Sequence, residues 1–469
     1  STDSSIVSME DSSSDDDDDI EDILLSEICS TDPAPPSTFL QANAVETCGH
    51  PRNARTVVRL PREHAQALHC INRDFLGPSP LYGSDFRTQF RISMSTFEYI
   101  MQEVMRSDIR FYRNRDDAAA CSVEARLLLP IKTLAYGVPP HTFMEYFQMS
   151  KSFCRTACIE FSKAMIEVFA TEFLRFPSAE DLANVIDLHK AVHGVNGMMG
   201  SLDCTKTTWR QCPTEWQGAY VGGKKDKPSI VLEAVTDHHT FVWHFSFGCV
   251  GSMNDLNVLA QSPLYEKFLD GTMARLESDC GRVPFAVGTQ QFHSVFVLVD
   301  GIYPRFSRFV RGFKVPLTHG EKVFTKWQEA ARKDVERAFG IMKAQWQFLA
   351  RPITGHDLED ISRSVYACLI LHNMNVTDRI MGNVRTKYKA NHSVQRETGG
   401  LSVPGAVQLV DNAEILQQIG VQRQGALTRY FVERTATEAQ RLANHDHLHD
   451  EAENGRLMNA LIDNVPQKK

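Results

Sequence analysis

The first 50 residues contain no Lys or Arg, although 13 of the 58 Asp and Glu of the chain lie there. The run DSSSDDDDDIED repels itself and has too little apolar surface to offset the entropy of folding. We therefore expect residues 1–60 to form a disordered acidic tail. This tail either keeps the protein in solution, or mimics nucleic-acid charge, or binds a partner. The remaining 419 residues carry 50 basic and 45 acidic residues, so the tail alone accounts for the net charge of −8.

Several other features are also missing. The 11 cysteines include no C-x-x-C pair, which argues against a zinc module or a disulfide framework and favours reduced intracellular thiols. No uncharged apolar stretch approaches about 20 residues, and the acidic start differs from a signal peptide, so we expect a soluble, unsecreted protein without a membrane segment. A small-molecule enzyme has no support, because there is no G-x-G-x-x-G and GGKKDK lacks the spacing of a phosphate loop.

Apolar residues recur at helical spacing between about residues 85 and 175. In MSTFEYIMQEVM, Phe97, Ile100, Met101, Val104 and Met105 have the spacing of one helix face. A second helix is predicted over residues 123–136, kinked at Pro130 and ended by a glycine. The pattern predicts an α-helical region before the next change in periodicity.

Two further helices complete the pattern of a helix-turn-helix unit. A short helix through Met144 and Phe147 should precede a long helix capped by Ser150. In that geometry the first turn of the long helix faces a major groove, and it contains Lys151, Ser152, Arg155 and Thr156. A helical bundle without DNA contact is the alternative, because residues 51–180 hold only 17 basic against 14 acidic residues.

Around residue 195 the pattern becomes strand-like. The runs NGMMGSLDC, PSIVLEAVTD and TFVWHFSFG predict three strands, followed by a helix that Asn254 or Asp255 caps and Gly271 ends. A fourth strand, VFVLVDG, precedes a long amphipathic helix, whose predicted buried side contains Phe324, Trp327, Ala331, Val335, Ala338, Met342 and Trp346. The order of these elements predicts a mixed α/β layer arrangement.

The C-terminal part is more polar. After the apolar helix RPITGHDLEDISRSVYACLILHNM, residues 380–425 should form a loose connection, and a last helix should lie near the C-terminus. His445, His447 and His449 of this helix point to different sides, so we interpret them as surface residues and not as a metal site. The predicted regions are 1–60, 61–194, 195–378 and 379–469.

Three carboxylates are the candidate site. Asp203 follows the apolar start of the first strand, Asp300 ends the fourth strand, and Glu336 lies at the border of the buried face of the long helix. If the two strands are neighbours, the three groups meet at one sheet edge. Carboxylates that close repel one another unless they take up protons or bind cations, and their hard oxygens suit Mg²⁺ or Mn²⁺. Two such ions would support displacement at phosphorus.

Each carboxylate also has a simpler interpretation. Asp300 followed by Gly301 fits a turn, Asp203 could accept a backbone hydrogen bond, and Glu336 could pair with Arg332 one turn earlier. Asp255 is a possible fourth ligand, but its place before an apolar helix favours N-capping. Only the combination of the three favours a functional site.

The chain resembles the transposases of the PIF/Harbinger superfamily and the nuclease-like proteins derived from them. The resemblance covers residues 85–376 and rests on GSLDCTKTTWRQCPTEWQGAY, IVLEAVTD, VWHFSFGCVGSMNDLNVLAQSPL, VLVDGIYP, QEAARKDVERAFGIMKAQW and LHNM. It implies an RNase H-like catalytic core with a DDE triad, which falls on Asp203, Asp300 and Glu336. The 35 residues between the last two are the spacing expected of this class.

The resemblance also implies a function. It implies cleavage at the ends of a DNA element and joining of the freed 3′-hydroxyls to target DNA, with two Mg²⁺ or Mn²⁺ ions as cofactors. It further implies action in the nucleus on double-stranded DNA, a Myb-like partner protein and a homo-oligomer. A domesticated, catalytically silent DNA-binding or chromatin-associated protein is the alternative that keeps the same fold.

Basic residues near the triad predict a DNA path. Residues 301–350 carry 10 Lys and Arg against 4 Asp and Glu. The residues that we expect to contact DNA are Lys151, Arg155, Arg305, Arg308, Arg332, Lys333, Arg337 and Lys343. For several of them a solvated helix face is the simpler interpretation.

Overall fold

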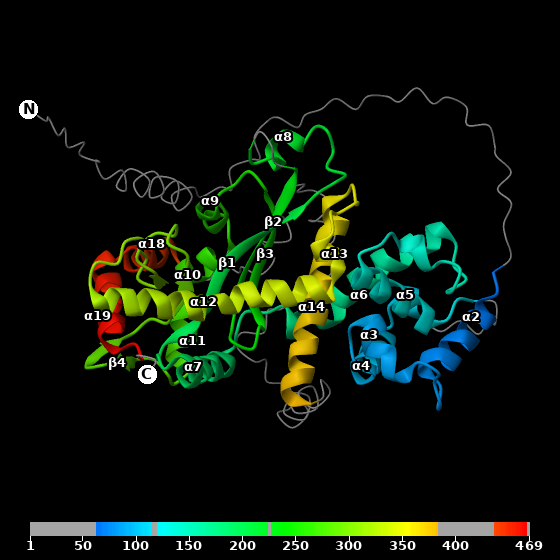
Figure 1. The fold of residues 1–469 in the computed structure, drawn as a ribbon, viewed down its shortest axis with the longest axis horizontal. Helices are drawn as coiled ribbons and strands as arrows, with labels where there is room; N and C mark the ends of the chain where they lie inside the picture. The colour runs from blue at the N-terminus through cyan, green and yellow to red at the C-terminus, as the bar shows by residue number, and fades with distance from the viewer. Residues whose placement is uncertain (1–61, 114–119, 224–226, 383–435, 467–469) are drawn as a thin grey trace, which may run out of the picture. The chain divides into compact units, whose positions relative to one another are not determined.

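The computed structural model describes residues 62–113, 120–223, 227–382 and 436–466. The predicted acidic tail and most of the predicted connection 380–425 lie outside the described residues. Within the described part, a helical region precedes a mixed sheet of five strands with helices around it (Figure 1). The predicted fold class, a mixed-sheet core of RNase H-like type after a helical region, is confirmed.

The described residues of the helical region form six α-helices. They are α2 (His64–Ile71), α3 (Phe86–Phe90), α4 (Met94–Arg106), α5 (Val123–Tyr136), α6 (Lys151–Phe173) and α7 (Ala179–His193). As predicted, α4 buries Phe97, Ile100 and Val104, whereas Met105 of the same predicted face is exposed. Helix α5 runs past Pro130 and ends at Gly137, whose positive φ of 59° favours glycine.

The helix-turn-helix segment agrees with the prediction in part. Ser150 caps α6, because its side chain accepts a hydrogen bond from the backbone N–H of Phe153. The predicted short helix through Met144 and Phe147 is wrong, since only a 3₁₀ turn at Pro140–Phe143 precedes these residues. Pro139 and Pro140 favour the start of such a turn, but residues 144–149 continue as turns and not as a helix.

The main sheet has the order β3-β2-β1-β6-β7. Its strands are β1 (Met198–Thr208), β2 (Ser229–Thr236), β3 (Val242–Val250), β6 (Phe296–Val299) and β7 (Phe309–Arg311). Strands β1, β2 and β3 pair antiparallel, whereas β6 is parallel to both β1 and β7. The first and fourth predicted strands, β1 and β6, are therefore neighbours, which was the condition for their carboxylates to meet. Strand β7 is too short to have been recognised from periodicity.

The connection between β3 and β6 is more divided than predicted. The single expected helix is three helices, α9 (Asp255–Ala260), α10 (Pro263–Leu269) and α11 (Thr272–Asp279). Pro263 lacks the N–H that would continue α9, and Ser262 caps α10 instead. A hairpin of β4 (Phe285–Val287) and β5 (Gln290–Phe292) follows and pairs separately from the main sheet.

Helix α12 (His319–Gln345) crosses the sheet and contacts β1, β2, β6 and β7 (Figure 1). Its predicted buried face is confirmed at Phe324, Ala331, Val335, Ala338 and Met342, and Trp346 directly after it is fully buried. The same face also buries two polar residues, Gln328 and Asp334. The Gln328 amide donates hydrogen bonds of 2.8 and 3.1 Å to the carbonyls of Val299 and Val310, which fixes α12 to the ends of β6 and β7.

Helix α14 (Leu358–Met381) joins the helical region to the sheet. It packs on α6 and on β3. Within its LHNM segment, Asn373 donates hydrogen bonds to the carbonyls of Phe173 and Val242 and accepts one from the N–H of Val242. One buried apolar cluster therefore extends from α4 and α5 through α14 to β2 and β3. The domain boundaries after residues 194 and 378 stay predictions.

Residues 436–466, the described C-terminal segment, form two helices where one was predicted. Helices α18 (Glu438–Leu448) and α19 (Glu451–Asn464) dock on the core, α18 on α10 and α19 on α12, β4 and β7. The interpretation of all three C-terminal histidines as surface residues is wrong for His445, which is buried and stacks on His449 at 3.9 Å. His447 lies 3.0 Å from the Ser294 hydroxyl. His445 is buried because α18 packs on α10, and sequence periodicity does not predict such packing between distant segments.

Two further α-helices, α8 (Gln217–Tyr220) and α13 (Gln347–Ala350), are short. None of the described helices has both the length and the apolar character needed to cross a bilayer.

Candidate metal and nucleic-acid site

The parallel pairing of β1 and β6 aligns the two candidate aspartates. Ser201 is paired with Leu298, so the same register carried two residues further brings Asp203 beside Asp300. The Ser201 hydroxyl lies 3.5 Å from the carbonyl of Ala331, so its side chain faces α12. Residues two apart on a strand share a face, and Asp203 therefore faces α12 as well. The two aspartates lie at the edge of the sheet where β6 ends.

Asp203 is in a partly buried and negatively charged environment. Its side chain is 21% exposed, and its Oδ1 accepts a hydrogen bond of 3.0 Å from the N–H of Cys204. Burial raises the pKa of the Asp203 carboxyl, and the nearby charges of Asp255 and Glu336 raise it further, against the opposing effects of that hydrogen bond and of Arg332. Like charges are therefore gathered around this carboxylate.

Arg332 connects Asp203 to the third candidate residue. Its guanidinium lies 3.4 Å from an oxygen of Asp203 and 3.1 Å from an oxygen of Glu336, one turn later on α12. The predicted ion pair between Glu336 and Arg332 is thus confirmed. However, because Arg332 also pairs with Asp203, the two carboxylates meet at one cation. Glu336 itself is half-exposed, so it is accessible from solvent.

Asp255 lies closer to this group than the sequence suggested. The helix cap of α9 is Asn254, whose side chain accepts a 2.8 Å hydrogen bond from the N–H of Asn257, so the preferred capping role of Asp255 is wrong. Burial raises the pKa of the Asp255 carboxyl, and the charge of Asp300 adds to this effect against a hydrogen bond from Cys204. Asp255 therefore lies within electrostatic range of both Asp203 and Asp300.

Asp300 is exposed and adjoins the end of β6. One carboxylate oxygen accepts a 2.7 Å hydrogen bond from the N–H of Gly301, as the turn interpretation predicted. The other oxygen is not held by this bond. Asp300 therefore ends a buried strand with its carboxylate at the solvent side of the edge.

The donor set fits divalent cations. Asp203, Asp255, Asp300 and Glu336 provide only carboxylate oxygens, the ligands that Mg²⁺ and Mn²⁺ prefer. Asp203 lies within electrostatic range of Asp255 and Glu336, and Asp255 within range of Asp300. Arg332 pairs with Asp203 and Glu336. Among the described residues, however, the oxygens of these carboxylates do not form a group within 4.8 Å of one another. Bound cations would offset both causes that raise the pKa of Asp203 and Asp255, burial first and then the repulsion between carboxylates.

One of the expected DNA-contacting residues is turned inward. Arg308 is buried and forms a bidentate ion pair with Glu277 of α11, one contact being 3.0 Å. The expectation that Arg308 lines a DNA path is therefore wrong. Arg308 immediately precedes β7, and the alternation of side chains turns its guanidinium into the space between the sheet and α11.

The other basic residues lie at or near the surface. Arg155, Lys151, Arg305, Lys333 and Arg337 are exposed. Lys343 is partly buried, and its Nζ lies 2.6 Å from the hydroxyl of Thr205, on the same face of β1 as Asp203. Burial lowers the pKa of the Lys343 ammonium. DNA contact by these residues and by Arg332 stays a prediction.

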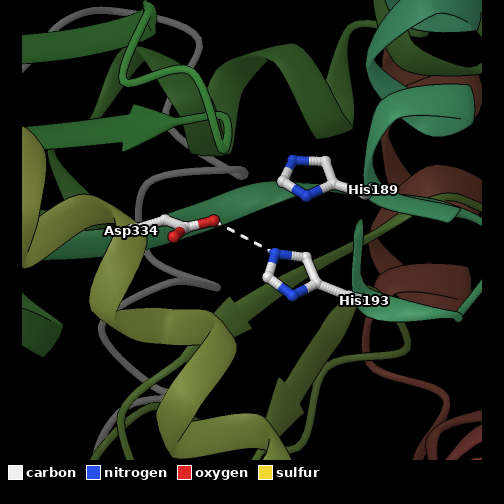
Figure 2. A group of neighbouring side chains, drawn as sticks. All are labelled: His189, His193 and Asp334. Carbon is white, nitrogen blue, oxygen red and sulfur yellow. Dashed lines mark hydrogen bonds and ion pairs between the residues drawn. The ribbon is translucent and has the colours of Figure 1, made fainter. Parts of the chain in front are cut away.

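Sequence reasoning missed a second polar cluster beneath α12. His189 and His193 on α7 and Asp334 on α12 have potential ligand atoms that all lie within 4.8 Å of one another, and Figure 2 shows the three side chains turned toward each other. The available signal was the segment HKAVH at 189–193, because two histidines four residues apart share a helix face. Nothing in the sequence indicated that Asp334 would join them.

Comparisons with known proteins place this arrangement in a family context. Residues 171–382 match the family model described as plant transposon protein. The Arabidopsis thaliana protein named antagonist of like heterochromatin protein 1 is 22% identical over 315 residues, which make up 63% of this chain and 75% of the relative. No solved structure matches the chain.

The family match has two general implications. A transposon protein of this kind is expected to bind DNA and to use a divalent ion, and both fit the carboxylate edge. The matched range also contains Asp203, Asp300 and Glu336. The resemblance inferred from the motifs is therefore confirmed: residues 171–382 are similar to plant transposon proteins.

Proposed function

We propose that the protein is a metal-dependent DDE transposase or endonuclease, which cuts DNA at the ends of a mobile element and joins the freed 3′-hydroxyls to target DNA. The observation that carries the proposal is the shared register of β1 and β6 together with Arg332, which pairs with both Asp203 and Glu336. The match to plant transposon proteins supports the same class of reaction.

In this proposal Asp203, Asp300 and Glu336 hold two Mg²⁺ or Mn²⁺ ions, and Asp255 is a candidate fourth ligand. When bound, such ions activate the attacking oxygen and neutralise charge on the leaving oxygen during in-line displacement at phosphorus. Arg332 neutralises two of the carboxylates before the ions bind, which keeps them close together. Lys343, held beside Thr205, would meet the phosphate backbone next to the triad.

The remaining basic residues would position the DNA. Exposed Lys151 and Arg155 in the first turn of α6 are available to a major groove, and exposed Arg305 and Lys333 lie near the triad in the sequence. Because the helical region has only a small excess of basic residues, we further propose that a Myb-like partner shares the phosphate contacts. Action as a homo-oligomer in the nucleus completes the proposal.

The test is cleavage of a plasmid that carries the terminal repeats flanking the coding region, with the purified full chain and Mg²⁺ or Mn²⁺. Asp300→Asn should lower the cleavage rate by at least about a hundredfold, since it removes a metal ligand. The matched control is Asp279→Asn, because Asp279 is exposed at the end of α11, outside the site. Equal rates for Asp300→Asn and Asp279→Asn would remove Asp300 from the mechanism.

A second candidate function follows from the relative. Its name describes an antagonist of like heterochromatin protein 1, and the alternative proposal is that this chain is a catalytically silent, chromatin-associated DNA-binding protein. Under this alternative the unaltered chain binds DNA but gives no cleavage with either ion, and Asp300→Asn leaves DNA affinity unchanged. Mg²⁺-dependent cleavage by the unaltered chain excludes it.

A further inference from the structure

The histidine and aspartate cluster beneath α12 joins three segments that are far apart in the sequence. His189 and His193 lie on the last turns of α7, His238 follows β2, and Asp334 lies on α12. The same oxygen of Asp334, Oδ2, lies 3.1 Å from Nε2 of His193 and 2.9 Å from Nδ1 of His238. Two imidazoles and one carboxylate thus have potential ligand atoms within 4.8 Å of one another, and His238 contacts the same carboxylate oxygen.

His189 is the residue that ordinary packing does not explain. It is fully buried, and neither of its ring nitrogens has a hydrogen-bond partner. A buried polar group without a partner costs free energy, which an ion would recover. Both ring nitrogens of His189 are thus available to a ligand, and they lie on the helix face shared with His193.

The opposite oxygen of Asp334 is held separately. Arg337 lies 3.1 Å from Oδ1 of Asp334 and also bonds the carbonyl of His238. This contact holds the carboxylate so that Oδ2 points to the histidines. Residues that hydrogen-bond to metal ligands commonly orient those ligands in this way. The separation of about 3 Å between potential ligand atoms around Oδ2 is close to the spacing of ligands around a tetrahedral ion with bonds of about 2.0 Å.

We propose that His189, His193 and Asp334 bind a divalent transition-metal ion of the zinc type, with His238 supplying the fourth ligand. Nitrogen-rich sets with one carboxylate favour zinc over magnesium, whereas the all-oxygen edge at Asp203 favours magnesium. The ion is structural. It joins α7 and the turn after β2 to α12, two residues before Glu336, and so fixes the helix that carries the third residue of the carboxylate edge.

The experiment measures bound metal and thermal stability of the full chain after removal of any affinity tag. We expect about one zinc ion per chain to survive dialysis, and cobalt substitution to give the visible absorption of a tetrahedral site. His193→Ala should weaken zinc binding by more than about tenfold, the smallest effect typical of removing even an outer partner. Asp300→Asn and His239→Leu, which leave the four ligands intact, should retain the ion.

His189→Leu distinguishes the proposal from a simple buried histidine. If no ion binds, replacing an unpartnered imidazole by an apolar side chain of similar size should leave the melting temperature unchanged or raise it. If an ion binds, the same variant should lose zinc and melt at a lower temperature. An unaltered chain that binds neither zinc nor cobalt, or a His189→Leu variant that melts higher in the presence of zinc, overturns the proposal. Neither readout depends on DNA cleavage, so the proposed transposase activity can fail separately.

Discussion

Arg332 stabilises the carboxylate edge in the absence of metal, and its removal should make the stability of the protein depend on Mg²⁺. The side chains of Arg332 and Asp203 are only 18% and 21% exposed and lie 3.4 Å apart. Opposite charges about 4 Å apart near a protein surface attract by about 4 kcal/mol, but desolvation and side-chain entropy offset most of this. The half-exposed Glu336 adds less than about 1 kcal/mol. We expect Arg332→Gln to lower the free energy of unfolding by about 1–3 kcal/mol.

Mg²⁺ should restore that loss, because the ion replaces the missing positive charge. An ion present at about 100 times its dissociation constant contributes about 2.7 kcal/mol. The assay is urea unfolding of the unaltered chain and of Arg332→Gln, each with and without Mg²⁺. Stability should differ between the two proteins without the ion and converge when it is present.

Arg363 provides the matched control. It lies on α14, is similarly buried, and also pairs with two carboxylates, those of Glu359 and Asp360. Arg363→Gln should cost a similar free energy, but Mg²⁺ should not restore it. If Mg²⁺ stabilises Arg332→Gln and Arg363→Gln equally, or neither of them, the carboxylate edge does not bind the ion as we infer.

Three further predictions concern residues outside the edge. Arg155→Ala should weaken DNA binding and lower the slope of affinity against salt by about 1, with unchanged folding; equal affinity would indicate a purely structural helix. Arg308→Met should lower the free energy of unfolding by about 3–5 kcal/mol, because it leaves Glu277 buried without its ion-pair partner. The DNA affinity of the folded protein should not change. Unchanged stability in a denaturant titration together with weaker DNA binding would contradict this prediction. Burial lowers the pKa of His372 to about 4, below the usual 6.5, so its contribution to stability is present above pH 6.5 and is lost as the pH falls toward 4. Between pH 7 and pH 5, the free energy of unfolding of His372→Gln should therefore fall by about 2 kcal/mol less than that of the unaltered chain. Parallel pH profiles of the two proteins would refute the lowered pKa.

Local patterns in the sequence predicted the elements that position the edge. The apolar run before Asp300 is a strand, the apolar face of α12 is buried as expected, and Ser150 and Gly137 bound their helices as their residue types require. Periods of two and 3.6 residues and the chemistry of helix ends act over a few residues, so one segment is enough to reveal them. Shorter elements such as β7 and the divided helices α9 to α11 fall below the length at which a period can be recognised.

The burial and the partners of each charged residue could not be predicted from local sequence patterns. The sequence made Arg308 equivalent to Arg305, yet one is buried against Glu277 and the other is exposed. It likewise suggested Asp255 as a helix cap, whereas Asn254 caps α9 and Asp255 lies near the triad. Such outcomes depend on which distant segment packs opposite a side chain.

The sequence by itself therefore determined the strands, the helix faces, the family motifs and the three carboxylates as a hypothesis. Tertiary structure decided that Arg332 joins Asp203 to Glu336 and that His189, His193 and Asp334 meet beneath α12. The physical reason is distance along the chain: backbone periodicity is set by neighbouring residues, while a charge or an imidazole acquires its partners only when segments more than 100 residues apart pack together.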